Sequence, residues 1–165
     1  KWLNPHFELD FMLIPSVPKY LIYLKQLAQN YSGIHFLNPV PIEEIVKIIN
    51  GYDIGLYLLK PNNFNNLHSL PNKFFEFIQA RLAIAIGPSP EMARLVRKYD
   101  CGIISQNYSP RSLAESLNSL DFSKIDYYKQ QSHKAAFELS SSINKDKLIQ
   151  LVANAIKRND PACAE

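Results

Sequence analysis

Residues 53–59 read DIGLYLL, residues 72–81 read NKFFEFIQAR, and residues 82–86 read LAIAI. The first and last of these runs are short and almost wholly apolar and predict strands, and the near-continuous apolar character of residues 53–59 suggests a strand that is buried on both faces. The run between them carries apolar residues at helical spacing and predicts a helix over 72–81. A strand, a helix and a strand in succession form a crossover between parallel strands. This stretch therefore predicts an α/β fold.

The same alternation of strand-like and helix-like runs extends in both directions from this stretch. Pro41, Glu43 and Glu44 suit the first turn of one helix, and Ser89 is expected to cap another. The pattern predicts one Rossmann-like, doubly wound parallel sheet in a three-layer αβα sandwich. We expect one domain over residues 1–158 and a frayed tail over 159–165. Further strands are predicted at 7–14, 34–37 and 102–105, and further helices at 19–31, 42–50, from Ser89 onward, 110–120, 125–140 and 145–158.

Composition excludes several classes of protein. The chain has 165 residues, 47% of them hydrophobic and 20% charged, which excludes intrinsic disorder. A net charge of +3, scattered along the sequence, does not indicate a nucleic-acid surface. Cys101 and Cys163 are too few for a disulfide framework, so we expect free thiols and a cytoplasmic location. No apolar run approaches the roughly 20 residues of a membrane span, and residues 1–5 read as part of an internal segment rather than a signal peptide.

Ligands of doubly wound sheets bind at the carboxyl ends of the strands. Three loops qualify, namely residues 38–41, 60–72 and 87–90. The sequence has no Gly-x-Gly-x-x-Gly after its first predicted strand and no Walker lysine loop, so the usual dinucleotide and nucleoside-triphosphate fingerprints are absent. No nucleophile–base pair and no metal-ligand spacing is visible, so catalytic residues stay unknown and no metal or cofactor is expected.

Lys73 and Glu76 stand out in the first turns of the helix at 72–81. A lysine at a helix start is unfavourable, by a few tenths of a kcal/mol to about 1 kcal/mol, unless an anion binds there. Lys73 is therefore either a phosphate ligand or a solvated side chain. Glu76 is either solvated or placed to accept hydrogen bonds from vicinal hydroxyls, as in ribose recognition. His68 can contact a sugar or phosphate, although a lone histidine in a loop is commonly only solvated.

Residues 70–80 (LPNKFFEFIQA), followed by a short strand and by residues 89–92 (SPEM), resemble the donor-site signature of family 4 (group 1) glycosyltransferases. Three flanking blocks are similar to those of the family in the same order. The resemblance covers about residues 7–120 and lies in the carboxyl-terminal, donor-binding half of the glycosyltransferase B (GT-B) fold. It implies two Rossmann-like domains that face a cleft. The flanking blocks are residues 34–41 (IHFLNPVP), 53–56 (DIGL) and 101–103 (CGI).

The resemblance also implies a role for each site residue. The backbone of Leu70, Pro71 and Asn72 and the side chain of Lys73 would hold the donor diphosphate. Glu76 would accept hydrogen bonds from the ribose. The nucleobase pocket would be lined by Asn38, Pro39 and Val40, and the donor sugar would lie near His68 and Ser69. The substrate would be a nucleotide sugar, linked to UDP or GDP.

Three departures from the family pattern are present. His68 stands where the family has the first Glu of its Glu-x7-Glu motif, and Arg81 stands where members often have Gly. The family's donor domain opens with a strand and a helix that bring an Arg and a Lys to the diphosphate. Residues 1–5 resemble the end of that helix, whereas the strand and the two cations would precede residue 1, so the domain is expected to be truncated at its amino end. The amino-terminal acceptor domain would precede it as well, so this piece alone is expected to be inactive.

The implied activity is transfer of a sugar to a glycan or a lipid-linked acceptor, as in bacterial surface polysaccharide biosynthesis. Two alternatives stay open. One is a nucleotide-sugar epimerase of the same fold, and the other is a degenerate transferase module that acts as a scaffold. The helix at 145–158 is amphipathic and modestly basic; its apolar face either packs on protein or lies at the inner face of a membrane.

Overall fold

The computed structural model describes residues 2–14 and 16–158. Strands and helices alternate along the chain, as the sequence predicts. The strands are β1 (Leu9–Met12), β2 (Ile34–Leu37), β3 (Ile54–Tyr57), β4 (Ala83–Ile86) and β5 (Gly102–Ile104). The helices are α1 (Pro18–Ala28), α2 (Ile42–Ile49), α3 (Phe64–His68), α4 (Asn72–Gln79), α5 (Pro90–Tyr99), α6 (Pro110–Asn118), α7 (Phe122–Glu138) and α8 (Ser141–Arg158).

All strand pairs are parallel, but they form two sheets instead of the single sheet predicted. β1 pairs with β2, with Leu9 opposite Ile34. β4 lies between β3 and β5, with Ile54 opposite Ala83 and Ile84 opposite Gly102. Within the described residues no ladder joins β1 to β3. The predicted α/β fold with parallel strands is confirmed, whereas the division of the strands between two sheets was not predicted, because apolar runs predict strands without saying which strands pair.

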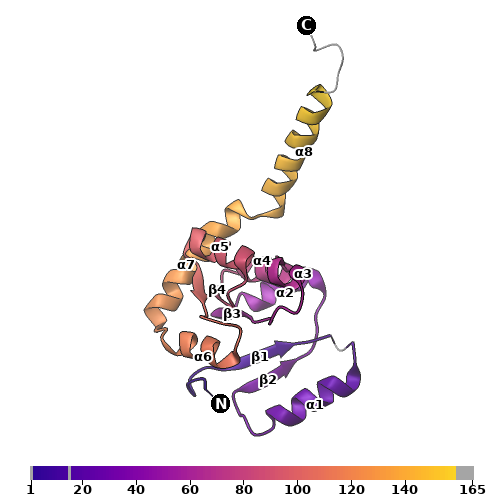
Figure 1. The fold of residues 1–165 in the computed structure, drawn as a ribbon. Helices are drawn as coiled ribbons and strands as arrows, with labels where there is room; N and C mark the ends of the chain where they lie inside the picture. Colours follow the sequence, from indigo (N-terminus) through magenta and orange to yellow (C-terminus); the bar gives the residue numbers. More distant parts are fainter. Residues whose placement is uncertain (1, 15, 159–165) are drawn as a thin grey trace.

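The core is built on β4, whose four residues are all buried. Ile84 and Ile86 pack on one face against α4, α5 and α7, whereas Ala85 packs on the other face against Leu113 and Leu117 of α6. Successive strand residues point to opposite faces, so these helices form two layers around the sheet. Figure 1 shows α2, α4 and α5 above the strands, with α1 below β1 and β2.

β3 is less buried than its sequence predicts. Gly55 is its single buried residue, and the side chain of Leu56 is 36% exposed. The prediction that this strand is buried on both faces is therefore wrong, and among the described residues β3 has a neighbouring strand on one side only.

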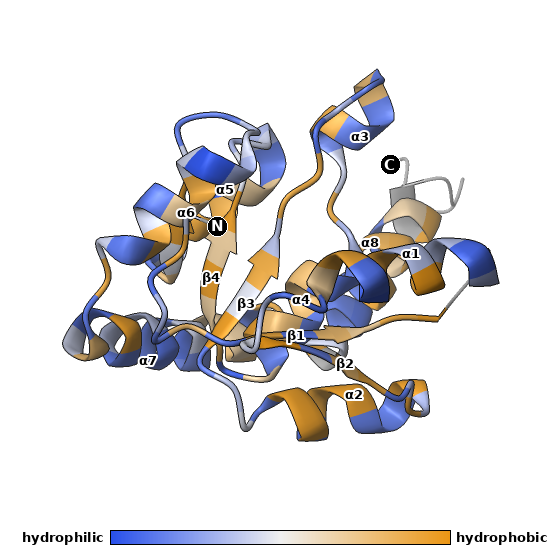
Figure 2. Cartoon of the chain, turned by 90° about the horizontal axis from the view of Figure 1, so that it is seen from below, coloured by the Kyte–Doolittle hydropathy of each residue, from blue (hydrophilic) through white to orange (hydrophobic). Residues whose placement is uncertain are grey.

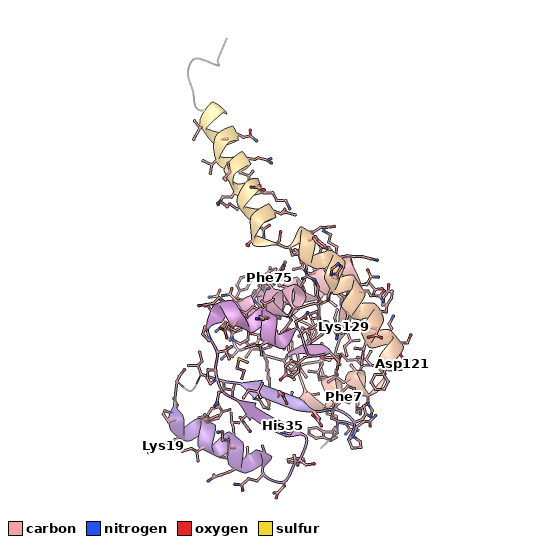
Figure 3. The ribbon with its side chains drawn as sticks, turned by 180° about the vertical axis from the view of Figure 1, so that it is seen from behind. Phe7, Lys19, His35, Phe75, Asp121 and Lys129 are labelled. Atoms are coloured by element: carbon pink, nitrogen blue, oxygen red, sulfur yellow. The ribbon has the colours of Figure 1, made fainter. Side chains whose placement is uncertain are left out.

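Polar contacts hold α7 against the three-stranded sheet. Its N-cap Asp121 accepts a hydrogen bond from the amide of Lys124 at 2.7 Å. Ser132 donates its hydroxyl proton to the carbonyl of Leu82 at 2.6 Å. The Lys129 ammonium donates to the carbonyl of Tyr52 at 2.9 Å and lies 3.0 Å from the carboxylate of Asp53. Figure 3 labels Asp121 and Lys129 on this helix. The start of β3 and the start of β4 are thus both held by α7.

Several element boundaries differ from the sequence-based predictions. α3 lies in a segment predicted as loop; Asn63 caps it by accepting a hydrogen bond from the amide of Asn66 at 2.8 Å. α8 begins at Ser141 instead of residue 145, and in Figure 1 it runs away from the rest of the molecule. The predicted tail at 159–165, with Cys163, lies outside the described residues, whereas Cys101 is free and buried.

The backbone at Arg81, which follows α4, adopts a conformation that is typical of glycine. Its φ is 65°, in the left-handed region that glycine adopts without strain. The arginine at this position is therefore held in a conformation that is strained for an L-residue.

Candidate functional site

The position of α4 is fixed by a close contact with β3. A Cβ atom at Gly55 would lie 2.6 Å from Cδ2 and 2.7 Å from Cβ of Phe77, so only glycine lets the helix approach this closely. Phe74 and Ile78 anchor the same helix in the core. The helix therefore starts at the carboxyl end of β3, which is where α/β sheets bind ligands.

The amino end of α4 carries backbone donors without an acidic partner. Its N-cap is Pro71, which makes no side-chain cap, and the first turn contains no acidic residue. The first amides of a helix have no acceptor within the helix, and the helix dipole makes this end positive. Lys73, an exposed side chain in this turn, adds a full charge. The start of α4 is thus an electropositive surface that favours an anion.

Lys73 and Glu76 both line a cavity of about 340 Å³. The lining also includes Met12 and Leu13 at the end of β1, and the carboxylates of Glu8 and Asp10. Glu76 is half-buried and Lys73 is exposed. The cavity therefore combines one cation and three carboxylates with largely apolar walls; a cation suits a phosphate, a carboxylate suits a ribose hydroxyl, and apolar walls suit a ring face.

The other predicted site residues do not line this cavity. His68 ends α3, and its ring centroid lies 4.4 Å from that of Phe64, with the two rings tilted by 33°. The Ser69 hydroxyl donates to the carbonyl of Asn66 at 3.2 Å. The remaining predicted residues are close in sequence to residues that line the cavity. Leu70, Pro71 and Asn72 lead into α4, and Asn38, Pro39 and Val40 follow Leu37, which lines the cavity.

Ser89 has a role that differs from its predicted one. It stands at the N-cap position of α5, but its side chain makes no capping bond. Its hydroxyl, which is buried, instead donates to the carbonyl of Leu67 at 2.8 Å. Ser89 therefore ties α3, and with it the loop that leads into α4, to the start of α5.

Sequence reasoning missed Asp10 and Tyr52, which face the same cavity. The Tyr52 hydroxyl donates to Oδ2 of Asp10 at 2.6 Å, and this hydrogen bond, with burial second, raises the pKa of Tyr52 above its usual value. One sequence signal was available: Asp10 is a charged residue in the middle of the apolar run at residues 7–14.

Two kinds of feature are absent from the described part of the chain. No group of three or more His, Cys, Asp or Glu side chains there is arranged to hold a metal ion. No helix among residues 2–14 and 16–158 combines the length and the apolar character needed to cross a membrane.

Comparison with known proteins shows the fold. No protein-family model matches the sequence, and no curated protein does. The structure is similar to the crystal structure of WaaG, a glycosyltransferase involved in lipopolysaccharide biosynthesis, with a TM-score of 0.55 and 15% sequence identity. The match covers 75% of this chain and 32% of that one, so the chain spans about a third of the solved protein's length. The fold is therefore α/β with parallel strands flanked by helices, as in one half of a GT-B protein.

Proposed function

We propose that this chain is the donor-binding half of a family 4 glycosyltransferase, the carboxyl-terminal domain of a GT-B protein. The observation that supports the proposal is the cavity at the start of α4, where Lys73 and Glu76 face apolar walls. Unpaired helix amides together with one lysine suit a diphosphate, and a carboxylate one turn further along suits the adjoining pentose. The likeness to WaaG in fold agrees with this reading.

The donor is a nucleotide sugar that carries UDP or GDP, and no metal or cofactor takes part. The backbone of Leu70–Asn72 holds the diphosphate with Lys73, while Asn38–Val40 line the nucleobase pocket and His68 and Ser69 lie toward the sugar. The acceptor is a glycan or a lipid-linked sugar bound by an amino-terminal domain, as in polysaccharide biosynthesis at the cytoplasmic face of a membrane. Transfer needs donor and acceptor aligned across a cleft, so the 165-residue chain alone is inactive.

A nucleotide-sugar epimerase of the same fold is the second candidate. An epimerase needs an acid or base beside the sugar, and His68 is the candidate that the sequence offers. Conversion of the free nucleotide sugar without an acceptor would favour this alternative. The third candidate is a degenerate module that acts as a scaffold, and it is favoured if the complete protein binds no nucleotide.

The diphosphate site is tested by calorimetric titration of the complete protein with UDP and GDP. Lys73→Ala removes one charge-assisted hydrogen bond, and we expect it to weaken binding of the preferred nucleotide about 10- to 100-fold. Lys47→Ala, on the neighbouring α2 and outside the cavity, is the matched control and should leave binding unchanged. Absence of binding of either nucleotide near millimolar concentration would favour the scaffold, and equal effects of the two substitutions would remove Lys73 from the site.

The ribose site is tested by comparing the preferred nucleotide with its 2′,3′-dideoxy analogue. The protein should bind the hydroxylated form about tenfold more tightly, and Glu76→Gln should reduce this preference several-fold, because a neutral amide accepts hydrogen bonds less strongly than a carboxylate. Glu44→Gln on α2 is the control. A preference that survives Glu76→Gln unchanged contradicts the assignment of Glu76.

A further inference from the structure

Side-chain contacts attach the carboxyl end of α4 to α7. Gln79, the last residue of α4, donates from Nε2 to the carbonyl of Ala136 at 3.0 Å. In the turn that follows, Arg81 donates from Nε to Nδ1 of His133 at 3.0 Å, and its guanidinium lies 5.8 Å from the centre of the Phe137 ring. The rings of His133 and Phe137, one turn apart on α7, have centroids 5.1 Å apart. Arg81 therefore contacts two neighbouring residues on one face of α7.

The hydrogen bond from Arg81 is compatible with only one protonation state of His133. A guanidinium can donate but not accept, and it stays charged, so Nδ1 must be the acceptor. The imidazole in this contact is therefore neutral, with its proton on Nε2. A second proton would have to bind Nδ1, where it would displace the hydrogen bond and bring two cations together. Protonation of His133 and its hydrogen bond with Arg81 thus exclude each other.

The turn at Arg81 depends on these contacts because its backbone is strained. Arg81 has a φ of 65°, which is unfavourable for an L-residue. It closes α4 with a Schellman motif, in which its own amide donates to the carbonyl of Ile78 at 3.0 Å and the amide of Leu82 donates to that of Phe77 at 3.1 Å. This motif requires the left-handed conformation at Arg81. Loss of the contact with His133 leaves the strain less well compensated, so the motif opens more often.

His133 is open to solvent and has no acidic partner. The residue is exposed, and Figure 2 shows hydrophilic residues along much of α7, so the imidazole can take up protons from water. No described carboxylate forms an ion pair with it. β4, which packs on α7, has no titratable side chain. The other titratable groups on α7 and on the elements around it are Lys129, which pairs with Asp53, Lys134, Glu138, which pairs with Lys98 and Tyr99 of α5, Lys147 of α8 near Glu138, and Lys73 and Glu76 of α4, which line the cavity.

We propose that Arg81 and His133 form a pH-sensitive contact that sets the position of α4. Above about pH 7 the neutral imidazole accepts the hydrogen bond and holds the end of α4 on α7. A histidine ordinarily takes up its second proton near pH 6.5, so the contact is lost as the pH falls below this value. Lys73 and Glu76 belong to the same eight-residue helix, so His133 is a positioning residue for the candidate site. The proposal concerns the attachment of α4 and does not depend on what the site binds.

The proposal is tested by residue-resolved hydrogen exchange on the complete protein at about pH 7.5 and 5.5. We expect the protection factors of the Arg81 and Leu82 amides to fall about 3- to 10-fold at the lower pH, which corresponds to the loss of one hydrogen bond. His133→Asn keeps a neutral acceptor close to the position of Nδ1, so protection should stay high at both pH values. His133→Leu removes the acceptor, so protection should be low at both. The amides of Ile84 and Ile86 in β4 are the control for changes in global stability.

Three results would overturn the proposal. An equal fall in protection in the wild-type protein and in His133→Asn assigns the pH dependence to another group. Protection in His133→Leu equal to that of the wild-type protein at the higher pH shows that the contact does not hold α4. The third result needs no variant: ¹⁵N chemical shifts of the imidazole should report a neutral ring protonated on Nε2 at the higher pH, and a ring protonated on Nδ1 contradicts the contact. Nucleotide binding is measured separately, so its failure does not affect these results.

Discussion

Arg81 holds a backbone conformation that its own side chain opposes. Its φ of 65° costs an L-residue about 1–2 kcal/mol relative to glycine. The guanidinium offsets part of this cost, since Nε donates to Nδ1 of His133 at 3.0 Å and Nη1 donates to the carbonyl of Gln79. It also lies 5.8 Å from the centre of the Phe137 ring. The strain and the contacts can be separated by two substitutions.

We expect Arg81→Ala to be less stable than Arg81→Gly by about 1 kcal/mol. Both variants lose the contacts to His133 and Phe137, but only glycine relieves the strain at this φ. Urea unfolding of both variants, followed by circular dichroism, measures the difference. Equal stabilities, or a more stable alanine variant, would show that the backbone relaxes away from the left-handed region.

Tyr52 is expected to make stability depend on alkaline pH. The hydrogen bond to Asp10 raises the pKa of Tyr52 in the folded state above the usual value near 10. Folding therefore favours the protonated phenol, so this contribution is complete below about pH 10 and is lost as pH rises through the folded pKa. We expect Tyr52→Phe to cost about 1 kcal/mol at pH 8 and progressively less above pH 10.

The measurement is the free energy of unfolding of both proteins between about pH 8 and 11. Tyr108 and Tyr127 also have raised pKa values, from burial and from the hydrogen bond to Asp100 respectively, but both are present in the two proteins and cancel in the difference. A difference that stays constant over this range would mean that the hydrogen bond to Asp10 is not linked to ionisation of Tyr52.

At the level of elements, the packing of α4 on β3 depends on the absence of a side chain at Gly55. Gly55→Ala places a methyl group against the ring of Phe77, and we expect a loss of about 1–3 kcal/mol in stability from overpacking. At Gly51 the nearest atom to an added Cβ is the carbonyl oxygen of Ile48 at 3.7 Å, an ordinary contact. Gly51→Ala is therefore the control, and it should be neutral or slightly stabilising.

The same substitution tests whether α4 positions the site. Because Lys73 and Glu76 belong to this helix, Gly55→Ala should also weaken nucleotide binding, and Phe77→Leu in the Gly55→Ala background should restore part of both losses. Chemical unfolding and titration calorimetry measure the two effects. Additive losses in the double variant would contradict a steric conflict between residues 55 and 77.

Across the whole molecule, the sequence predicts which segments form strands and helices better than it predicts which strands pair. The runs at residues 53–59 and 82–86 are apolar enough to predict strands, and they do form β3 and β4. Pairing depends on contacts between distant segments, so the break between β1 and β3 has no local signature. α3 was missed because FNNLH has no apolar period, and the helix depends on the side-chain cap from Asn63.

In the candidate site, too, the relation between residues near in sequence is predictable, whereas the relation between residues distant in sequence is not. Lys73 and Glu76 are three residues apart on one helix, so helical geometry predicts that they face the same space, and both do line the cavity. Asp10 and Tyr52 are 42 residues apart, and their hydrogen bond depends on how the sheets lie relative to one another. Local pattern cannot predict such a pair. The ligand-binding roles of all the predicted site residues stay predictions, including those of Leu70–Asn72, Lys73 and Glu76.

The uneven distribution of buried residues has a consequence for biosynthesis. Buried residues begin at Gly55, and the last among those described is Ala136 on α7. A ribosome adds about 5–20 residues per second, so α1, β1, β2 and α2 emerge several seconds before the helix that completes the core. During that interval Tyr20, Ile22 and Leu27 offer an apolar surface to any chaperone at the tunnel exit. Translation speed between codons 55 and 136 therefore sets how long the nascent chain must be protected from aggregation.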